Sequence, residues 1–134
     1  MEVQVRPVAY VVTVWPESVT CMDAALWCVS VLDESYGNWS VRRGHVSGDR
    51  PPSGQEAPAL GRDGKWHYEN LPSQRKAAEL ERDRFTLEEA RKLAEDMAPR
   101  VELNGMTAVD AYVRHEQRRA SLGACPGCAG PYTT

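Results

Sequence analysis

The chain has 134 residues, of which 42% are hydrophobic and 26% charged, and its formal net charge is −3. A chain of this length is the size of one ordinary domain and can bury a core without disulfides or metal. The small net charge excludes a strongly basic nucleic-acid binder and a strongly acidic polyanion mimic. Only three of the sixteen basic residues are lysine and isoleucine is absent, which indicates a GC-rich genome.

The first half of the chain predicts strands. Residues 8–14 (VAYVVTV) are apolar at both parities, which is typical of a central strand covered on both faces. Residues 25–32 (ALWCVSVL) and 38–43 (NWSVRR) flank a turn, so they predict a hairpin with Trp39 and Val41 on one face.

A long surface loop is expected next, over residues 44–64, because this segment is dense in Gly, Pro and Ser and has no periodicity. Residues 57–60 predict a short strand inside it. The Asp63-Gly64 turn then starts another strand, KWHYE at residues 65–69.

The second half of the chain predicts helices. Ser73 is placed to cap a helix through residues 74–83. Thr86 and Glu89 form a capping box, and a helix with apolar residues at helical spacing follows until Pro99. A third helix begins after Thr107 and runs to about residue 119.

Strands followed by helices predict an α+β domain. We expect an antiparallel sheet of about four strands from the N-terminal half, with two to three helices from the C-terminal half packed on one face. Residues 1–120 form the domain, and residues 121–134 form a flexible tail. The helical residues expected to be buried against the sheet are Leu87, Leu93, Met97, Val109, Tyr112 and Val113.

The tail contains CPGC, in which Cys125 and Cys128 resemble half of a zinc site. His115 is the nearest third ligand, and a fourth would come from Cys21 or from the tail of a second chain in a homodimer. Because the set is incomplete and the domain is large enough to fold without metal, we expect no cofactor and reduced, exposed thiols.

No phosphate-binding loop, HExxH helix or GxSxG elbow occurs in the sequence, so it predicts no enzyme. His67 would need a partner from the loop, such as Asp49 or Asp63, to take part in catalysis. An enzyme with a site in the long loop is the remaining catalytic alternative.

Arginine and aromatic residues gather along the loop and its borders, and they predict a binding surface. Its expected members are Trp39, Arg42, Arg43, Arg62 and Trp66. Trp and Arg are enriched at protein–protein hot spots, which favours a protein partner. The same residues also fit phosphate contacts and base stacking, so a small nucleic-acid-binding regulator is the alternative.

Three segments carry a family resemblance: DGKWHYENLPSQR, RFTLEEARKLAEDMAP and VELNGMTAVDAYVRHE. Together they resemble a family of small uncharacterised proteins of actinobacteria and actinobacteriophages, over roughly residues 8–118. The resemblance implies an α+β domain that binds a host or phage protein, and it carries over no catalytic residue.

The N-terminus lacks a secretory signal, and no apolar run reaches the roughly 20 residues of a membrane-spanning helix. We therefore expect a cytoplasmic protein, in the host cytoplasm if it is phage-encoded, with no membrane partner. The expected function is a non-enzymatic protein-binding module.

Overall fold

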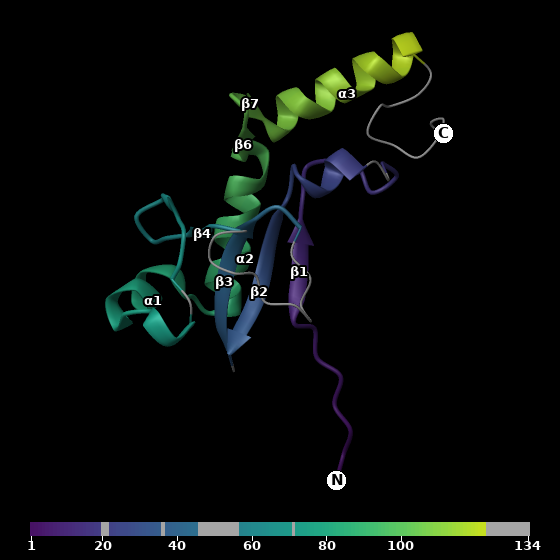
Figure 1. Cartoon of the computed structure of the whole chain (residues 1–134). Coiled ribbons are helices and arrows are strands. Elements are labelled where there is room, and N and C mark those ends of the chain that lie inside the picture. Colours follow the sequence, from purple (N-terminus) through teal and green to yellow (C-terminus); the bar gives the residue numbers. More distant parts are fainter. Residues whose placement is uncertain (20–21, 36, 46–56, 71, 123–134) are drawn as a thin grey trace.

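The computed structural model describes residues 1–19, 22–35, 37–45, 57–70 and 72–122 (Figure 1). It is an α+β fold, as predicted from the order of strands and helices. Its strands are β1 (Ala9–Val12), β2 (Val29–Ser35), β3 (Asn38–Arg43), β4 (Ala59–Leu60), β5 (Trp66–His67), β6 (Glu102–Leu103) and β7 (Met106–Thr107). Its helices are α1 (Ala77–Asp83), α2 (Leu87–Met97) and α3 (Ala108–Leu122), with 3-10 turns η1 (Met22–Ala25), η2 (Pro72–Gln74) and η3 (Ala98–Arg100).

The main sheet is antiparallel throughout, in the order β1-β2-β3-β4-β5. The predicted hairpin is confirmed, with β3 over the expected residues and Val31 opposite Val41. The prediction for β1 was wrong, because this strand lies at the edge of the sheet and not in its centre. Val11 is about half exposed, so the apolar residues at both parities do not reflect cover on both faces.

The second strand begins four residues later than predicted, because the chain first forms the 3-10 turn η1. The backbone N–H of Leu26 donates to the Asp23 carbonyl oxygen at 3.0 Å and closes this turn. Cys28, the last residue before this strand, is buried.

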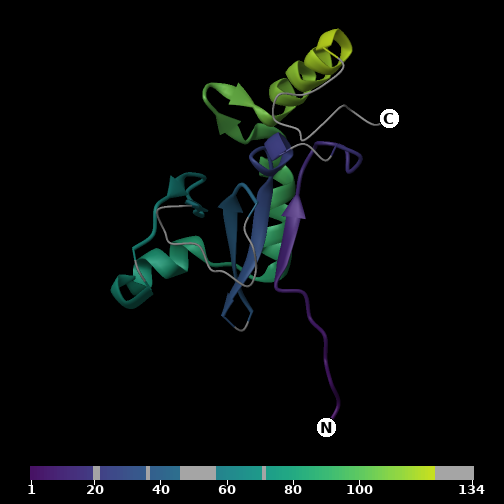
Figure 2. The same ribbon diagram turned by 45° about the vertical axis from the view of Figure 1, so that its right-hand side comes forward.

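One face of the sheet holds the apolar core, and α2 covers it (Figure 2). Val29, Val31 and Val41 are fully buried there, and Trp39 is 6% exposed. α2 presents small residues to them, since Ala90 and Ala94 are fully buried. Small side chains allow a helix to lie close to a sheet. α2 can therefore pack directly on the core and cover most of it.

The helix starts agree only in part with the sequence. Thr86 caps α2, accepting a hydrogen bond from the Glu89 N–H at 3.2 Å, while Glu89 accepts from the Thr86 N–H at 3.1 Å. Ser73 is not a helix cap, because it lies in η2 and α1 begins at Ala77. Ser73 follows Pro72 and precedes a polar run, a composition that helix starts share, and this explains why the sequence predicted a cap there.

Residues 102–107 form a hairpin that the sequence analysis did not predict. Asn104 and Gly105 adopt φ values of 53° and 76°, as a tight turn between two short strands requires. α3 follows directly and extends beyond the end of the sheet to Leu122, three residues further than predicted (Figures 1 and 2).

The predicted inward face of α3 was wrong. Val109 and Val113 are 45% and 49% exposed, whereas Ala108, Ala111 and His115 are buried. The cause is Trp15, whose indole N–H donates to the Ala108 carbonyl oxygen at 2.9 Å and so fixes the rotation of the helix. Leu87, Leu93, Met97 and Tyr112 pack against the core, although they are only partly buried and not fully buried as predicted.

No helix among the described residues is both long and apolar enough to cross a membrane. Residues 46–56, in the middle of the predicted loop, and the tail after Leu122 lie outside the described part of the chain.

Candidate binding surface

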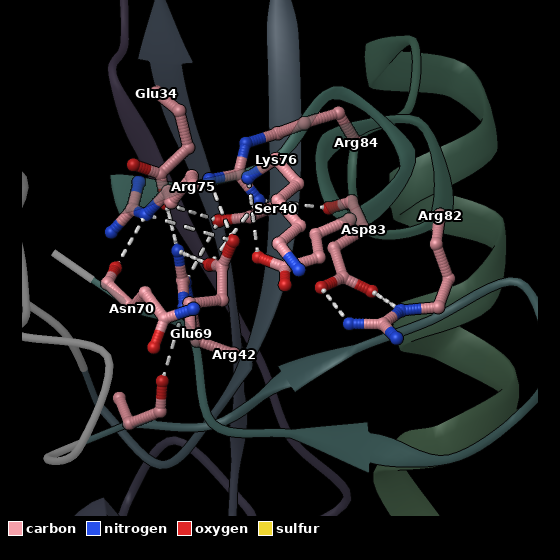
Figure 3. A network of polar contacts seen from close by, with 12 residues as sticks. Glu34, Ser40, Arg42, Glu69, Asn70, Arg75, Lys76, Arg82, Asp83 and Arg84 are labelled. Atoms are coloured by element: carbon pink, nitrogen blue, oxygen red, sulfur yellow. Dashed lines mark hydrogen bonds and ion pairs between the residues drawn. The ribbon is translucent and has the colours of Figure 1, made fainter. Parts of the chain in front are cut away.

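The face of the sheet opposite α2 carries a buried ion-pair network (Figure 3). Arg42 is fully buried, and its guanidinium Nη2 lies 2.6 Å from Oε1 of Glu34. The same nitrogen pairs with Oε1 of Glu69. Arg42 Nη1 donates to the Ala57 carbonyl oxygen at 3.1 Å, and the Ser40 hydroxyl donates to Glu34 at 2.6 Å.

Glu69 extends this network towards α1. Arg84 Nη2 lies 3.1 Å from Oε2 of Glu69, and Arg75 Nε lies 3.9 Å from the same oxygen. Arg75 also donates to the Asn70 carbonyl oxygen at 2.8 Å. The side chains of Glu69, Arg84 and Arg75 are 10% exposed or less. The network therefore fastens the segment around α1 to the polar face of the sheet.

The electrostatics of Glu34 show how strongly the network is coupled. Burial alone would raise the pKa of this carboxyl, but the charge of Arg42 and hydrogen bonds from Ser40 and Arg42 reverse the effect. The pKa of Glu34 is lowered as a result, so the carboxylate is the stable form in the fold.

The predicted binding residues are not brought together. Trp39 and Arg42 are interior residues, unavailable to a partner of the folded domain. Arg43 is half-buried at the end of β3, and Trp66 packs partly against the core. Of the five residues only Arg62 is exposed. Its guanidinium donates to the carbonyl oxygens of residues 81 and 84 and lies 4.6 Å from the Phe85 ring centroid.

Asp63 and His67 form a pair, as the catalytic alternative required. His67 Nε2 lies 2.8 Å from Asp63 Oδ2, and this contact lowers the pKa of Asp63. Gly61 makes room for the pair, because a Cβ there would lie 2.6 Å from Asp63 Oδ1 and 3.0 Å from Asp83 Oδ1. Asp83 itself is buried and ion-paired with Arg82 at 2.8 Å. These contacts explain Gly61 structurally and identify no nucleophile. The other partner considered, Asp49, lies outside the described residues.

The outer edge of β1 has no strand partner among the residues that the structure describes. The N–H of Asp33 donates to the Val8 carbonyl oxygen at 2.8 Å, and Tyr10 and Val12 lie opposite Val31 and Val29. Backbone groups alternate in direction along an antiparallel strand, so Ala9 and Val11 direct their N–H and C=O groups away from β2. No strand in the described part of the chain pairs with that edge.

Edge strands are usually protected by charged residues, proline or bulges. β1 has none of these: its sequence is AYVV, and its register with β2 is regular. Val8, Val11 and Val14 are 41–48% exposed along this part of the chain. The edge was not predicted because an apolar strand was assigned to the centre of the sheet. Pro7 lacks an N–H and is the residue in the sequence that indicates a sheet boundary.

One side of α2 lies beside β1. Arg91 of α2 is 5.4 Å from the Tyr10 ring centroid. A shallow groove of about 660 Å³ runs along the same helix and is lined by Leu87, Glu88, Arg91, Lys92 and Glu95. The β1 edge and the neighbouring flank of α2 thus combine unpaired backbone with charged side chains.

The predicted zinc ligands are not assembled within the described structure. Cys125, Cys128 and Cys21 lie outside the described residues. His115 is 4% exposed and packs with its ring centroid 5.2 Å from that of Trp15. Among the residues described, no group of three or more His, Cys, Asp and Glu side chains is arranged to hold a metal ion.

Comparison with protein-family models, curated proteins and solved structures finds no match. The resemblance to proteins of actinobacteria and actinobacteriophages therefore stays a prediction.

Proposed function

We propose that this chain is a non-enzymatic protein-binding module that captures an extended segment of its partner along the outer edge of β1. The supporting observation is the outer edge of β1 at Ala9 and Val11, with which no strand in the described part of the chain pairs. A peptide that adds as a sixth strand satisfies these backbone groups directly, and its side chains alternate between the two faces of the sheet.

The flank of α2 would provide selectivity. Side chains of the added strand that point to the α2 face lie beside Tyr10 and Arg91. Glu88, Lys92 and Glu95 continue this flank with both signs of charge. A partner with an apolar residue next to Tyr10 and an acidic residue next to Arg91 fits this arrangement best.

The contacts of the arginines favour a protein over a nucleic acid. Arg42 is enclosed, Arg62 is bonded to backbone carbonyl groups, and the two do not share a surface. Phosphate binding requires clustered, accessible cations. The resemblance stated above supports a partner from an actinobacterial host or its phage, in the cytoplasm.

The test uses two variants at one position, because the Val11 N–H points away from β2. Val11→Pro removes this donor and fills the edge with the pyrrolidine ring, without removing a bond to β2. Val11→Ala keeps the donor and serves as the matched control. Both variants should remain folded, and only Val11→Pro should lose the protein that the wild type captures from an actinobacterial lysate.

Capture that survives Val11→Pro would contradict strand addition at β1. Sedimentation of the purified wild type shows whether the edge pairs with a second copy instead, and we expect a monomer. A gel shift with duplex DNA or RNA that weakens steeply with salt would favour the nucleic-acid alternative.

A further inference from the structure

A second concave site lies between α3 and the segment that contains η1. Its volume is about 200 Å³. Trp15, Trp27 and Met106 supply an apolar wall, and Arg114 and Arg118 of α3 line the same pocket. The pocket is separate from the β1 edge and from the exposed Val109 and Val113, which lie on another side of α3.

The aromatic wall is held in place before any ligand binds. Trp15 is 4% exposed, and its indole N–H donates to the Ala108 carbonyl oxygen at 2.9 Å. Its ring also packs against Tyr112 and His115, with centroid separations of 5.6 and 5.2 Å. A rigid wall of this kind loses little conformational entropy when a flat ring packs against it.

The charges in the pocket are unequal. Arg114 and Arg118 are one helical turn apart, and neither has an ion-pair partner among the described residues. Asp23 lines the pocket from the η1 side and already has an interaction of its own. Two unpaired guanidinium groups beside one engaged carboxylate attract an anion, and guanidinium geometry suits a carboxylate.

We propose that this pocket binds a small organic anion in which a carboxylate is attached to a single aromatic ring. The ring would pack against Trp15 and Trp27, and the carboxylate would accept hydrogen bonds from Arg114 and Arg118. The size is suitable, since a dry protein cavity of roughly 150 Å³ holds benzene and this pocket is about 200 Å³.

Benzoate is the probe, and benzamide is its neutral control of nearly the same shape. NMR of the indole N–H groups follows binding, because Trp15 and Trp27 line the pocket while Trp39 and Trp66 lie elsewhere. Benzoate should shift the Trp15 and Trp27 signals saturably and leave the other two unchanged. The affinity for benzamide should be lower than that for benzoate by roughly tenfold or more, as expected for loss of a charge-assisted contact.

Arg114→Ala and Arg118→Ala should each weaken benzoate binding by about tenfold, without changing the weak binding of benzamide. Arg119→Ala is the matched control, because Arg119 belongs to the same helix and pairs with Glu116 outside the pocket. It should bind benzoate as the wild type does.

Equal binding of benzoate and benzamide, or no saturable shift up to the solubility limit, would overturn the proposal. N-acetylphenylalanine carries its carboxylate on the α-carbon and not on the ring, so it should bind more weakly than benzoate. Binding tighter than benzoate would overturn the proposal in favour of a peptide C-terminus.

Discussion

Replacing Arg42 by methionine should destabilise the domain strongly. The change preserves an apolar stem of similar length but removes the guanidinium that pairs with Glu34 and Glu69. Both carboxylates would then remain in a site where the Glu69 side chain is 1% exposed and that of Glu34 is 11% exposed. The Ala57 carbonyl oxygen would also lose its donor.

Removing one partner of a buried ion pair costs about 3–5 kcal/mol, because the other charge remains buried without compensation. Arg84 and Arg75 still contact Glu69, which places the expected loss near the lower value, at roughly 3 kcal/mol. Small domains have total stabilities of about 5–15 kcal/mol, so such a loss is readily measured.

Urea denaturation gives the free energy of unfolding of each variant. Arg43→Met is the matched control, since the neighbouring residue is half-buried and has no ion pair in the described structure; it should lose no more than about 1 kcal/mol. Adding Glu34→Gln and Glu69→Gln to Arg42→Met should restore part of the loss. A free energy for Arg42→Met within about 1 kcal/mol of the wild type would refute a structural role for the network.

Three further predictions concern pH, packing and thiol chemistry. Because the pKa of Glu34 is lowered in the fold, its contribution to stability is present above the ordinary carboxyl pKa of about 4.3 and is lost as the pH falls through the folded value. Glu34→Gln should therefore flatten this part of a curve of unfolding free energy against pH. An unchanged slope in the acid range would contradict this role of Glu34. Leu93 is only partly buried, so Leu93→Ala should cost about 2 kcal/mol in urea denaturation, the low end for a core leucine, and a loss above about 4 would contradict its placement. Burial raises the pKa of Cys28 to about 11, so its reaction with a thiol reagent at pH 8 should require unfolding and give a slow phase of labelling. This slow phase should disappear in Cys28→Ala. Its persistence would show that another thiol causes it.

Local patterns predicted the elements that local chemistry determines. The capping box at Thr86 and Glu89, the β3 strand and the shared face of Trp39 and Val41 all follow from side chains within a few residues. The same reasoning failed where a distant contact decides the outcome. The rotation of α3, for example, depends on Trp15, which is 93 residues before Ala108 in the chain.

The candidate binding residues lie apart in the structure for a related reason. Side chains alternate between the two faces of the strand that contains Arg42. Whether the face with Arg42 is exposed to solvent depends on Glu69 and Arg84, which lie far along the chain. The position of β1 at the sheet edge is likewise a property of the whole topology. A sequence of this kind specifies its strands and helices better than the surfaces they leave free.

Amide hydrogen exchange at Ala9 and Val11 tests the β1 edge most directly. In the protein alone these two amides should exchange much faster than those of Tyr10 and Val12, which face β2. After saturation with the protein that the wild type captures, Ala9 and Val11 should become protected as strongly as their neighbours. Protection that appears elsewhere while these two amides keep exchanging fast would show that the partner binds another surface.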